Sequence, residues 1–543
     1  MTQNKAIAIF SLVATIICSC TKLDENLGNS FTNNQVSTGL GAGGTGLILQ
    51  GAYVDLATPF TAQDNVFSLE ENSTDESLVP TRGGDWDDNG VWRVVHNHTW
   101  TPDHGQILTV FNNLNKLNFD ATNVLSFNPS PAQAAEARFL RAYSLYYLLD
   151  LYGQFPFRNP GDNLLNAPKV YTGDSAVSFI INELTTIMPD LNPSNDMTKA
   201  NQDAAKVLLM RCYLNRGAFV NRQTPTFADA DLEQVITLGN EIISSGKYSY
   251  MPEYFDNFTA GIKSTEGILA YPNTSGVSAN NSGIDARWMM TLHYNSYKAQ
   301  APNAGWNGFS TMSDFYKTFG ATAPATLTQA DSVLDGRIGL RFNKNVTPYS
   351  GLKPGMLIGQ QYAADGTPEK DRKGNPLAFD PNIASSMIEQ GSNLEVTGIR
   401  VIKYVPDFTD HGGAFYSANS GNWLMLMRYP EVVLMVAEAE MRTGNTAGAL
   451  TLVNQLRTAR HAAPLTSISL VNTSNVDDPH TLLAETGREL YWESLRRTNL
   501  IRFGVFNVLW QYKPSDDPKY LVYPVPNQSL AANPNLKQNP GYN

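Results

Sequence analysis

The chain contains little cysteine. Of the three cysteines in 543 residues, Cys18 and Cys20 lie close to the N-terminus, and only Cys212 lies in the remainder. Because a disulfide needs two cysteines, a disulfide framework is excluded for that remainder. Cys212 stands in the apolar stretch AAKVLLMRCYL, where a buried and unreactive thiol is the expected state.

The chain also lacks a long apolar run and an excess of positive charge. The apolar run at 6–17 is shorter than the roughly 20 residues that a membrane-spanning helix needs. The formal net charge is −11, which argues against a nucleic-acid partner because phosphate binding requires a basic surface. With 42% hydrophobic and 16% charged residues, the chain is expected to fold around a large core.

Sequence patterns typical of catalysis and of cofactor binding are missing as well. There is no GxSxG elbow, no Walker-type phosphate loop and no HExxH pair. His96, His98 and His104 lie close in sequence, but without further ligand spacing hydrogen-bonded loop histidines are the better interpretation. A GxGxxG pattern at 39–44 follows no predicted strand, so it does not indicate a dinucleotide site. We therefore expect no catalytic activity, no metal and no cofactor.

The N-terminal residues have the pattern of an export signal. Lys5 precedes the apolar run at 6–17, and the run ends at Ser19-Cys20. A small residue directly before a cysteine resembles the bacterial lipoprotein box, which predicts that residues 1–20 are a signal peptide and that Cys20 is lipidated. An ordinary signal peptide with an incidental cysteine is the alternative. Residues 21–46 are polar and rich in glycine, and they predict a flexible tether.

Residues 428–464 predict two antiparallel helices. Apolar residues recur at helical spacing on both sides of Gly444 and Asn445, and Thr446 is a candidate cap for the second helix. Small residues such as Ala437 and Ala449 allow the two backbones to approach closely. The pattern resembles the tetratricopeptide repeat, and an ordinary helical hairpin is the alternative.

Further helices are predicted along the chain. Ser130 and Pro131 predict the start of one helix and Gly153 its end. A charged, amphipathic helix is predicted at 481–499, where ion pairs at i+3 and i+4 spacing explain the charges. The remaining predicted helices lie at 47–57, 107–117, 174–188, 201–215 and 229–245.

These patterns predict a mainly α fold: a tetratricopeptide-like, superhelical scaffold of helix pairs that carries a large loop-rich insertion with short strands and helices. Residues 47–251 form the N-terminal part of the scaffold, with a tryptophan-rich loop at 64–104. Residues 252–422 are dense in Gly, Pro, Asn and Ser, and so long a loop-rich stretch is expected to be functional and to face the ligand. Residues 423–543 return to helices and end in an extended tail.

Several long motifs in one order resemble the SusD/RagB family of outer-membrane nutrient-binding lipoproteins of Bacteroidetes. The lipoprotein box at Cys20 is followed by Lys22, Asp24 and Glu25. The other motifs are EARFLRAYSLYYLLDLYGQFPF at 136–157, GWNGFSTMSDFYKTF at 305–319, RYPEVVLMVAEAEMRTG at 428–444, ETGRELYWESLRRTNLIRFG at 485–504 and YPVPNQSLAANPNLKQNPGYN at 523–543.

The resemblance implies a surface-exposed, lipid-anchored protein that binds oligosaccharide and presents it to a SusC-like TonB-dependent transporter of the outer membrane. The acidic residues after Cys20 look like a signal for the cell surface. Two alternatives stay open: a peptide-binding lid of the same architecture, and a lipid-anchored glycoside hydrolase. The hydrolase would take its carboxylate pair from Asp85, Asp87, Asp88, Glu70 and Glu71.

Two groups of residues suit an oligosaccharide. Sugars offer flat C–H faces and hydroxyl groups, and they favour exposed aromatic rings beside Asp, Asn, Gln or Arg. The first group surrounds Asp85 and Trp86 and includes Trp92; the second surrounds Trp306, with Arg287 and Tyr294 upstream. In the family, such loops often line the glycan site. The predicted binding residues are Asp85, Trp86, Trp92, Trp288, Tyr297, Asn303, Trp306 and Asn307. Packing of the loops onto the helices is the alternative role for each tryptophan.

Overall fold

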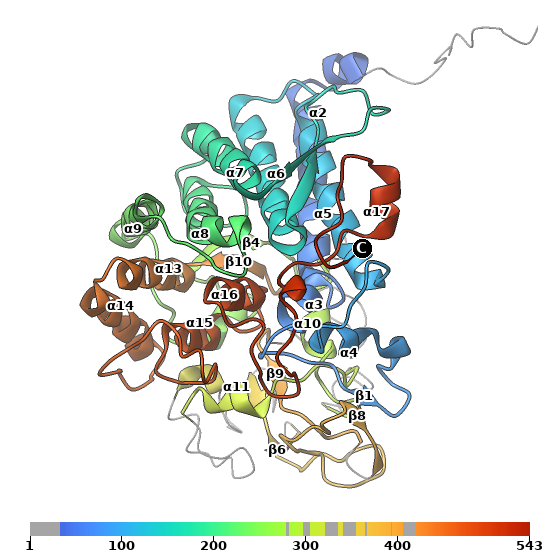
Figure 1. The fold of residues 1–543 in the computed structure, drawn as a ribbon, viewed down its shortest axis with the longest axis vertical. Coiled ribbons are helices and arrows are strands. Elements are labelled where there is room, and N and C mark those ends of the chain that lie inside the picture. The colour runs from blue at the N-terminus through green and yellow to red at the C-terminus, as the bar shows by residue number, and fades with distance from the viewer. Residues whose placement is uncertain are drawn as a thin grey trace, which may run out of the picture.

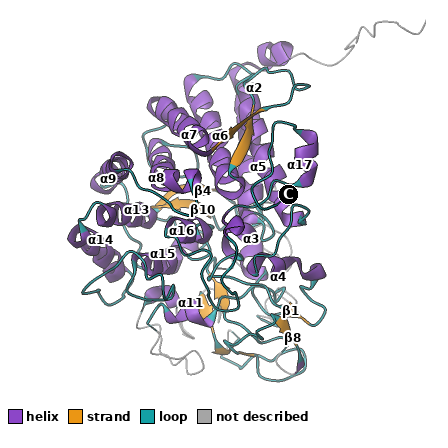
Figure 2. Cartoon of the chain, in the orientation of Figure 1, coloured by secondary structure: helices purple, strands orange, loops and turns teal. Residues whose placement is uncertain are grey.

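Helices make up most of the upper part of the molecule, and loops with short strands make up much of the lower part (Figure 1, Figure 2). The computed structural model describes residues 33–277, 282–296, 305–320, 335–339, 354–363, 366–391, 394–405 and 420–542. The prediction of a mainly helical fold with small strands in a loop-rich middle region is confirmed. The domain boundaries remain predictions.

The long helices form an array in which each member contacts the next along the chain. The step from α9 to α13 is also a direct contact, so the array continues across the loop-rich region that separates these two helices in sequence. Its members are α2 (Asn33–Thr61), α5 (Gly105–Val124), α6 (Pro131–Tyr152), α7 (Gly173–Ile187), α8 (Gln202–Val220), α9 (Asp229–Ser244), α13 (Tyr429–Arg442) and α14 (Thr446–Ala459).

Helix α6 lies deep in this array and begins and ends as predicted. The Ser130 side chain accepts a hydrogen bond from the Gln133 backbone, and Pro131 occupies the first helical position. Gly153 ends the helix with a φ of 71°, a left-handed conformation that glycine adopts without strain. Every residue from Phe139 to Tyr152 is buried, because α6 is covered by α2, α5 and α7. Cys212 of α8 is also fully buried, as predicted.

Two local predictions require correction. Asn445, not Thr446, caps α14, since its side chain accepts from the Gly448 backbone at 3.1 Å. Residues 33–46 were predicted as part of a tether, but they belong to α2. Each glycine destabilises a helix by about 1 kcal/mol relative to alanine, so the glycine-rich sequence favoured a tether. Helix α2 also packs against α5 and α6, and helix propensity takes no account of such tertiary contacts.

The strands are short and pair two by two. The sheets are β1 (Thr81–Arg82) with β8 (Ile388–Glu389), β2 (Gln154–Phe157) with β3 (Lys169–Thr172), β4 (Gly267–Tyr271) with β10 (Leu424–Arg428), β5 (Gly355–Leu357) with β9 (Arg400–Ile402), and β6 (Gly359–Gln360) with β7 (Ala378–Phe379). The β1–β8 pair is parallel and the others are antiparallel. Strand β10 runs directly into α13, so the β4–β10 pair joins the loop-rich region to the scaffold.

The remaining helices are short. They are α3 (Val66–Glu71), α4 (Val91–His96), α10 (Ala286–Met289), α11 (Ser313–Lys317), α15 (Leu482–Leu490), α16 (Arg496–Arg502) and α17 (Asn527–Ala532). The single helix predicted at 481–499 is therefore two helices. They separate at Trp492 and Ser494, whose φ angles are 60° and 62°. The carbonyl of Glu489 accepts hydrogen bonds from Arg428 and Tyr254, which takes this carbonyl out of a continued helix.

The charges of that segment are buried, not spread over a surface. Glu489 and Glu266 each meet both Arg428 and Arg460, with the four nearest N–O distances between 2.8 and 3.1 Å. Arg337 joins them through Glu489 at 3.3 Å and Glu485 at 2.8 Å. Each of these side chains has a relative accessibility of 0%. We call Glu266, Arg337, Arg428, Arg460, Glu485 and Glu489 the buried charge cluster.

The buried charge cluster corrects the prediction that ion pairs at i+3 and i+4 spacing explain the charges of this segment. One such pair exists, between Glu485 and Arg488 at 2.6 Å, but most partners come from distant segments. These partners lie just before β4, at the end of β10, just after α14 and, for Arg337, in the loop-rich region. The cluster thus holds the loop-rich region and the helical array together.

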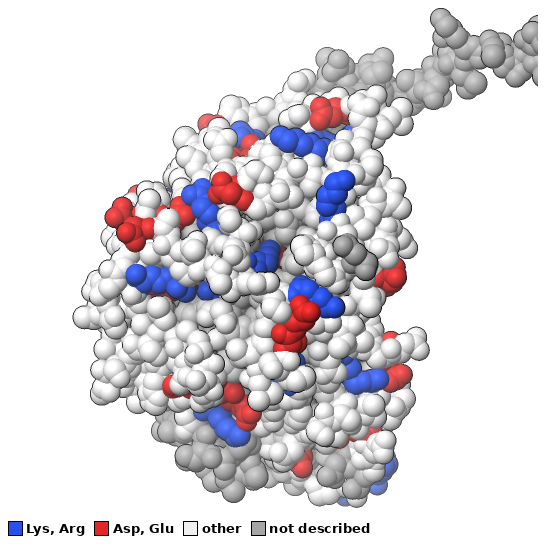
Figure 3. Space-filling view, in the orientation of Figure 1, with Lys and Arg blue, Asp and Glu red and all other residues white. Residues whose placement is uncertain are grey.

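The outer surface carries its charges differently. On the face shown in Figure 3, the visible Lys and Arg side chains are scattered among Asp and Glu and form no broad basic patch. Within the described residues, no helix combines the length and the apolar character needed to cross a membrane.

Candidate functional site

An open cavity of about 500 Å³ lies at the loop-rich end of the molecule. It joins the loop that follows β1 to a segment far along the chain, since Trp86 and Trp306 are 220 positions apart. We call it the tryptophan cavity. It is lined by Asp85, Trp86, Asp88, Tyr294, Gly305, Trp306 and Arg372.

Trp86 is held in place from several sides. Its indole nitrogen donates to the Trp306 carbonyl at 2.7 Å. Its ring meets Trp92 and Phe309 edge-on, with centroids 5.3 and 5.5 Å apart. A Cβ atom on Gly308 would lie only 2.4 Å from the indole, so the absence of a side chain there makes room for the ring. Trp86 remains half-buried, which leaves part of a fixed aromatic surface open.

Trp306 is fixed through its backbone. Its nitrogen donates to the Met289 carbonyl at 2.6 Å, and its own carbonyl accepts from Trp86. A side chain on Gly305 would meet the Leu292 carbonyl at 2.1 Å, so the chain passes close to α10 because residue 305 is glycine. The Trp306 side chain is half-buried and lines the tryptophan cavity.

Asp85, Tyr294 and Arg372 supply the polar side of the cavity. The Tyr294 hydroxyl donates to Asp85, and burial together with this carboxylate raises the Tyr294 pKa, so the hydroxyl keeps its proton. The Arg372 guanidinium lies 4.0 Å from the centre of the Tyr294 ring and 3.8 Å from Asp85. Asp85 and Arg372 are each about half exposed, and both can therefore meet a ligand.

A second ion pair, with Glu395, also holds the Arg372 side chain in place. Its nitrogen lies 2.7 Å from Glu395, and Glu395 also meets His293 at 2.9 Å. Burial opposes the ionised form of Glu395, but the hydrogen bonds from Arg372 and His293 outweigh it and lower the Glu395 pKa. Burial lowers the His293 pKa to about 4 despite the Glu395 carboxylate, so His293 is neutral at pH 7. Arg372 is thus positioned by an ionised carboxylate.

The sequence and the fold can now be compared with known proteins. The model of the SusD family matches residues 265–542, more than half of the chain. The chain belongs to the SusD family. The resemblance inferred from the sequence motifs is confirmed.

The similarity to members of the SusD family extends over most of this chain. The starch-binding protein SusD of Bacteroides thetaiotaomicron is 24% identical over 494 residues, which cover 88% of this chain and 85% of that protein. A SusD-like protein from Bacteroides fragilis has 16% identity and a TM-score of 0.67, over 92% of this chain and 97% of the other. Surface glycan-binding protein A of Bacteroides thetaiotaomicron, solved in complex with laminarihexaose, has 17% identity and a TM-score of 0.64, over 91% and 98%.

The SusD family also settles the question of catalysis. It is a family of non-catalytic, glycan-binding proteins of polysaccharide utilisation, so the expectation that this chain is no enzyme is confirmed. Glu70 and Glu71 are fully buried in α3, and they do not line the tryptophan cavity. Within the described residues, no group of three or more His, Cys, Asp or Glu side chains is placed to hold a metal ion.

The fold brings together three of the predicted binding residues, Asp85, Trp86 and Trp306. Trp92 is only 5% exposed; it packs behind Trp86, and its indole donates to Asp88 at 2.7 Å. Trp288 and Asn307 are 1% and 0% exposed, and neither lines the cavity. Tyr297, Asn303 and the lipidation candidate Cys20 lie outside the described residues.

The histidines considered as metal ligands are hydrogen-bonded and buried. His96 meets the Asn72 carbonyl at 3.1 Å, and His98 meets the Ser73 carbonyl and the Asp516 carboxylate. Sequence reasoning missed Arg372, which stands in the stretch KDRKG without an aromatic neighbour. Only its spatial position beside Tyr294 identifies it.

Proposed function

We propose that this protein is a cell-surface lipoprotein of the outer membrane that captures oligosaccharide in the tryptophan cavity and delivers it to a SusC-like TonB-dependent transporter. One observation carries the ligand site. Asp85, Trp86 and Trp306, singled out from sequence, line one open cavity, although Trp306 lies 220 positions from Trp86 in the chain. Two relatives add support, since one is a starch-binding protein and another was solved in complex with laminarihexaose.

The proposed binding mode follows from the lining. The exposed parts of Trp86 and Trp306 offer apolar surface to the C–H faces of sugar rings. Asp85 accepts hydrogen bonds from hydroxyl groups, and Arg372 donates to them. Because the Trp86 indole is fixed by a hydrogen bond and ring contacts and the Trp306 backbone is fixed by hydrogen bonds, little conformational freedom is lost on binding. Because the cavity is open, an internal stretch of a long glycan can enter it without a free chain end.

The test compares two tryptophans in similar settings. Trp306→Ala should weaken binding of the cognate glycan by about 1–3 kcal/mol, the range for burial of one large side chain. Trp423→Ala is the matched control, because Trp423 is also half-buried and its indole donates to a backbone carbonyl, that of Asn273, at 3.1 Å, but it lies outside the cavity. Calorimetric titration against a glycan panel gives the affinities, and melting curves give the stabilities. Equal affinities for the two variants would contradict the proposed site.

The membrane anchor and the delivery step need their own tests. A fatty-acid probe should label the wild type and not Cys20→Ser in growing cells. Trp306→Ala cells should take up less cognate glycan than wild-type cells while showing the same amount of the protein at the surface. Equal labelling would refute lipidation at Cys20. Equal uptake would show that delivery does not depend on glycan binding in the tryptophan cavity.

A further inference from the structure

A second cavity, of about 420 Å³, lies in the helical part of the molecule. Its walls are the second half of α5, the turn that follows β2 and the helix α17. In Figure 1, α17 lies at the upper right, whereas β1 and β8 beside the tryptophan cavity lie near the lower end. The two cavities share no lining residue. The volume lies within the range of about 300–1,000 Å³ that is typical of small-molecule sites. We call it the carboxamide cavity.

The two charged side chains of the carboxamide cavity, Arg158 and Asp162, have opposite signs. The Arg158 guanidinium donates to the backbone carbonyls of Asn163 at 2.9 Å and Leu164 at 3.2 Å. The Asp162 carboxylate accepts from the Asn159 backbone at 2.7 Å. Both charged side chains of the lining are therefore committed to the turn itself. Because the two charges are opposite, the lining carries no net charge and gives no overall preference to an anionic or a cationic ligand.

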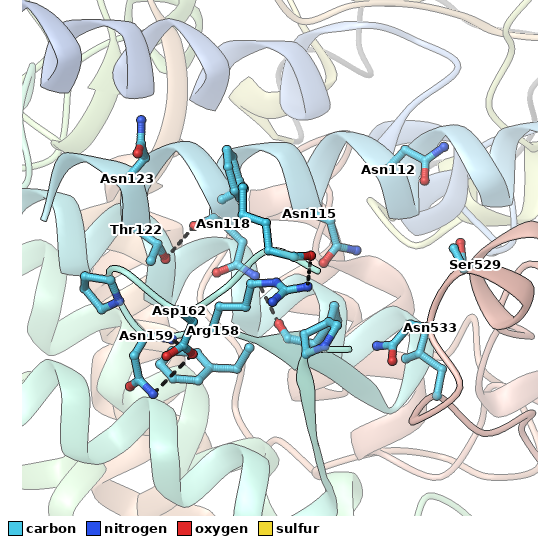
Figure 4. A pocket seen from close by; sticks show the side chains of 18 of the residues that line it. Asn112, Asn115, Asn118, Thr122, Asn123, Arg158, Asn159, Asp162, Ser529 and Asn533 are labelled. Carbon is cyan, nitrogen blue, oxygen red and sulfur yellow. Dashed lines mark hydrogen bonds between the residues drawn. The ribbon is translucent and has the colours of Figure 1, made fainter. Parts of the chain in front are cut away.

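The rest of the polar lining consists of groups that can both donate and accept hydrogen bonds. Figure 4 shows Asn115, Asn118 and Thr122 on the side of α5 that faces Arg158, with Ser529 and Asn533 coming from the side of α17. The carboxamides and hydroxyls of the lining are those of Asn112, Asn115, Asn118, Thr122, Asn123, Ser126, Asn159, Ser529 and Asn533.

Two of these groups lack partners. The side-chain nitrogen of Asn533, a residue only 6% exposed, has no hydrogen-bond partner among the described residues, and neither has the side-chain oxygen of Asn115. A buried polar group left unpaired costs about 1–3 kcal/mol. A ligand with hydroxyl groups could satisfy both. Beside them, Phe119 and Leu164 are 47% and 64% exposed, so the same cavity offers apolar surface to a flat ligand face.

An extended peptide is the less suitable ligand. Peptides often bind by adding a strand to a sheet edge, and β2 is the strand that borders the cavity. Pro156 of β2 has no N–H group, and its carbonyl already accepts from the Asn118 side chain at 3.1 Å. At this point β2 therefore offers neither a free N–H group nor a free carbonyl group to an added strand.

We propose that the carboxamide cavity is a second saccharide-binding site, specific for uncharged sugars and independent of the tryptophan cavity. The Phe119 ring lies against one sugar face. The Asn115 and Asn533 side chains exchange hydrogen bonds with hydroxyl groups. Because the charges of Arg158 and Asp162 balance, nothing in the lining favours the carboxylate of a uronic acid or the sulfate of a sulfated sugar over a neutral sugar.

The experiment removes the first site and then the second. Neutral hexasaccharides, laminarihexaose and maltohexaose among a panel built from other hexoses and pentoses, are titrated at millimolar concentration into Trp306→Ala protein. Weak residual binding of at least one neutral saccharide is expected. Adding Phe119→Ala should lower that residual affinity about two- to tenfold, since an aromatic contact contributes about 0.5–1.5 kcal/mol. Asn115→Leu should act in the same direction. Leu165→Ala is the control, because Leu165 is 93% exposed in the same turn but does not line the cavity.

The outcomes separate the two sites. Residual binding that Phe119→Ala and Asn115→Leu leave unchanged would overturn the proposal, as would no residual binding of any neutral saccharide. Binding of a charged sugar or a proline-rich peptide in this cavity, in place of a neutral saccharide, would also overturn it. If Phe119→Ala alone abolished binding while Trp306→Ala left it intact, the carboxamide cavity would stand and the proposed function of the tryptophan cavity would fail. Crystals soaked with the best hexasaccharide locate it directly.

Discussion

The buried charge cluster and the tryptophan cavity use the same kinds of side chain in opposite ways. In the cluster, Glu489 lies within 3.1 Å of Arg428 and 2.8 Å of Arg460, and none of the three side chains is accessible. In the cavity, Asp85 and Arg372 are 3.8 Å apart and about half exposed. An ion pair that water cannot reach must be complete, because an unpaired buried charge is very costly. An exposed pair contributes little to stability and remains free to meet a ligand.

This difference in the exposure of the ion pairs indicates separate roles for the buried charge cluster and the tryptophan cavity. The cluster joins β4, β10, α14 and α15 and so fixes how the loop-rich region sits on the helices. The tryptophan cavity then takes its shape from loops that the cluster indirectly supports. Changes in the first region should therefore affect stability above all, and changes in the second should affect binding above all.

The largest effect is expected for Glu489→Ala. It leaves the buried guanidiniums of Arg428 and Arg460 without one of their shared partners, and breaking a buried pair in this way costs about 3–5 kcal/mol. Urea unfolding measures the loss in the free energy of unfolding. Glu241→Ala is the control, since its pair with Lys206 at 3.0 Å is about half exposed on the Glu241 side and should contribute less than about 1 kcal/mol. Equal losses for both variants would remove the distinction between the two kinds of ion pair.

A pH-dependent effect is expected at Glu76, which lies beside Gly487 of α15 and Arg496 of α16. Burial raises its pKa from 4.5 to about 8; Arg496 and Lys403 oppose this shift, and Asp75 adds to it. Between these two pH values the folded protein holds a proton that the unfolded chain releases, so the free energy of unfolding falls as pH rises. Glu76→Gln removes that titration. Relative to the wild type, it should gain roughly up to 1.4 kcal/mol for each pH unit in this window.

Denaturant unfolding at several pH values between 4.5 and 8 measures this difference. Below that window both proteins carry an uncharged side chain at position 76, so their stabilities should converge. A stability difference that stayed constant with pH would show that Glu76 is ionised in the folded protein. Arg496, 3.3 Å from Glu76, would then be the group that keeps it charged.

An intermediate effect is expected for Gly308→Ala in the tryptophan cavity. The new Cβ atom would lie 2.4 Å from the Trp86 indole and would push the ring from its place. Such overpacking typically costs about 1–3 kcal/mol of stability, and glycan affinity should fall with it because Trp86 lines the cavity. Gly84→Ala is the control, since nothing lies within 4 Å of its added Cβ. Unchanged affinity in Gly308→Ala would show that Trp86 takes no part in binding.

Sequence patterns predicted what depends on local residues. The start of α6 at Ser130 and its end at Gly153 follow from capping chemistry within a few positions. The loop-rich stretch and the two tryptophan-bearing loops were predicted from composition. These features need no knowledge of which segments meet in space.

The same patterns failed where distant segments decide. Glu485 and Glu489 occupy positions typical of surface ion pairs on a helix, yet Arg337, Arg428 and Arg460 bury them. Trp288 stands near Trp306 in sequence but packs in the core, whereas Arg372 stands near no tryptophan but enters the cavity. Burial and pairing at these positions are properties of the whole fold, which residue types alone do not encode.

The smallest effect, and the sharpest contrast with Glu489→Ala, is expected for Asp85→Asn. The substitution removes a charge but keeps the size and a hydrogen-bonding oxygen for Tyr294. Because Asp85 and Arg372 are about half exposed, water can solvate Arg372 after the change, and the free energy of unfolding should stay within about 0.5 kcal/mol of the wild type. Affinity for the cognate glycan should fall by about 1 kcal/mol, because a neutral amide accepts hydroxyl hydrogen bonds less strongly than a carboxylate does. Calorimetric titration and urea unfolding on the same preparation measure both quantities. A large loss of stability with unchanged affinity would place Asp85 with Glu489, as part of the framework and outside the ligand site.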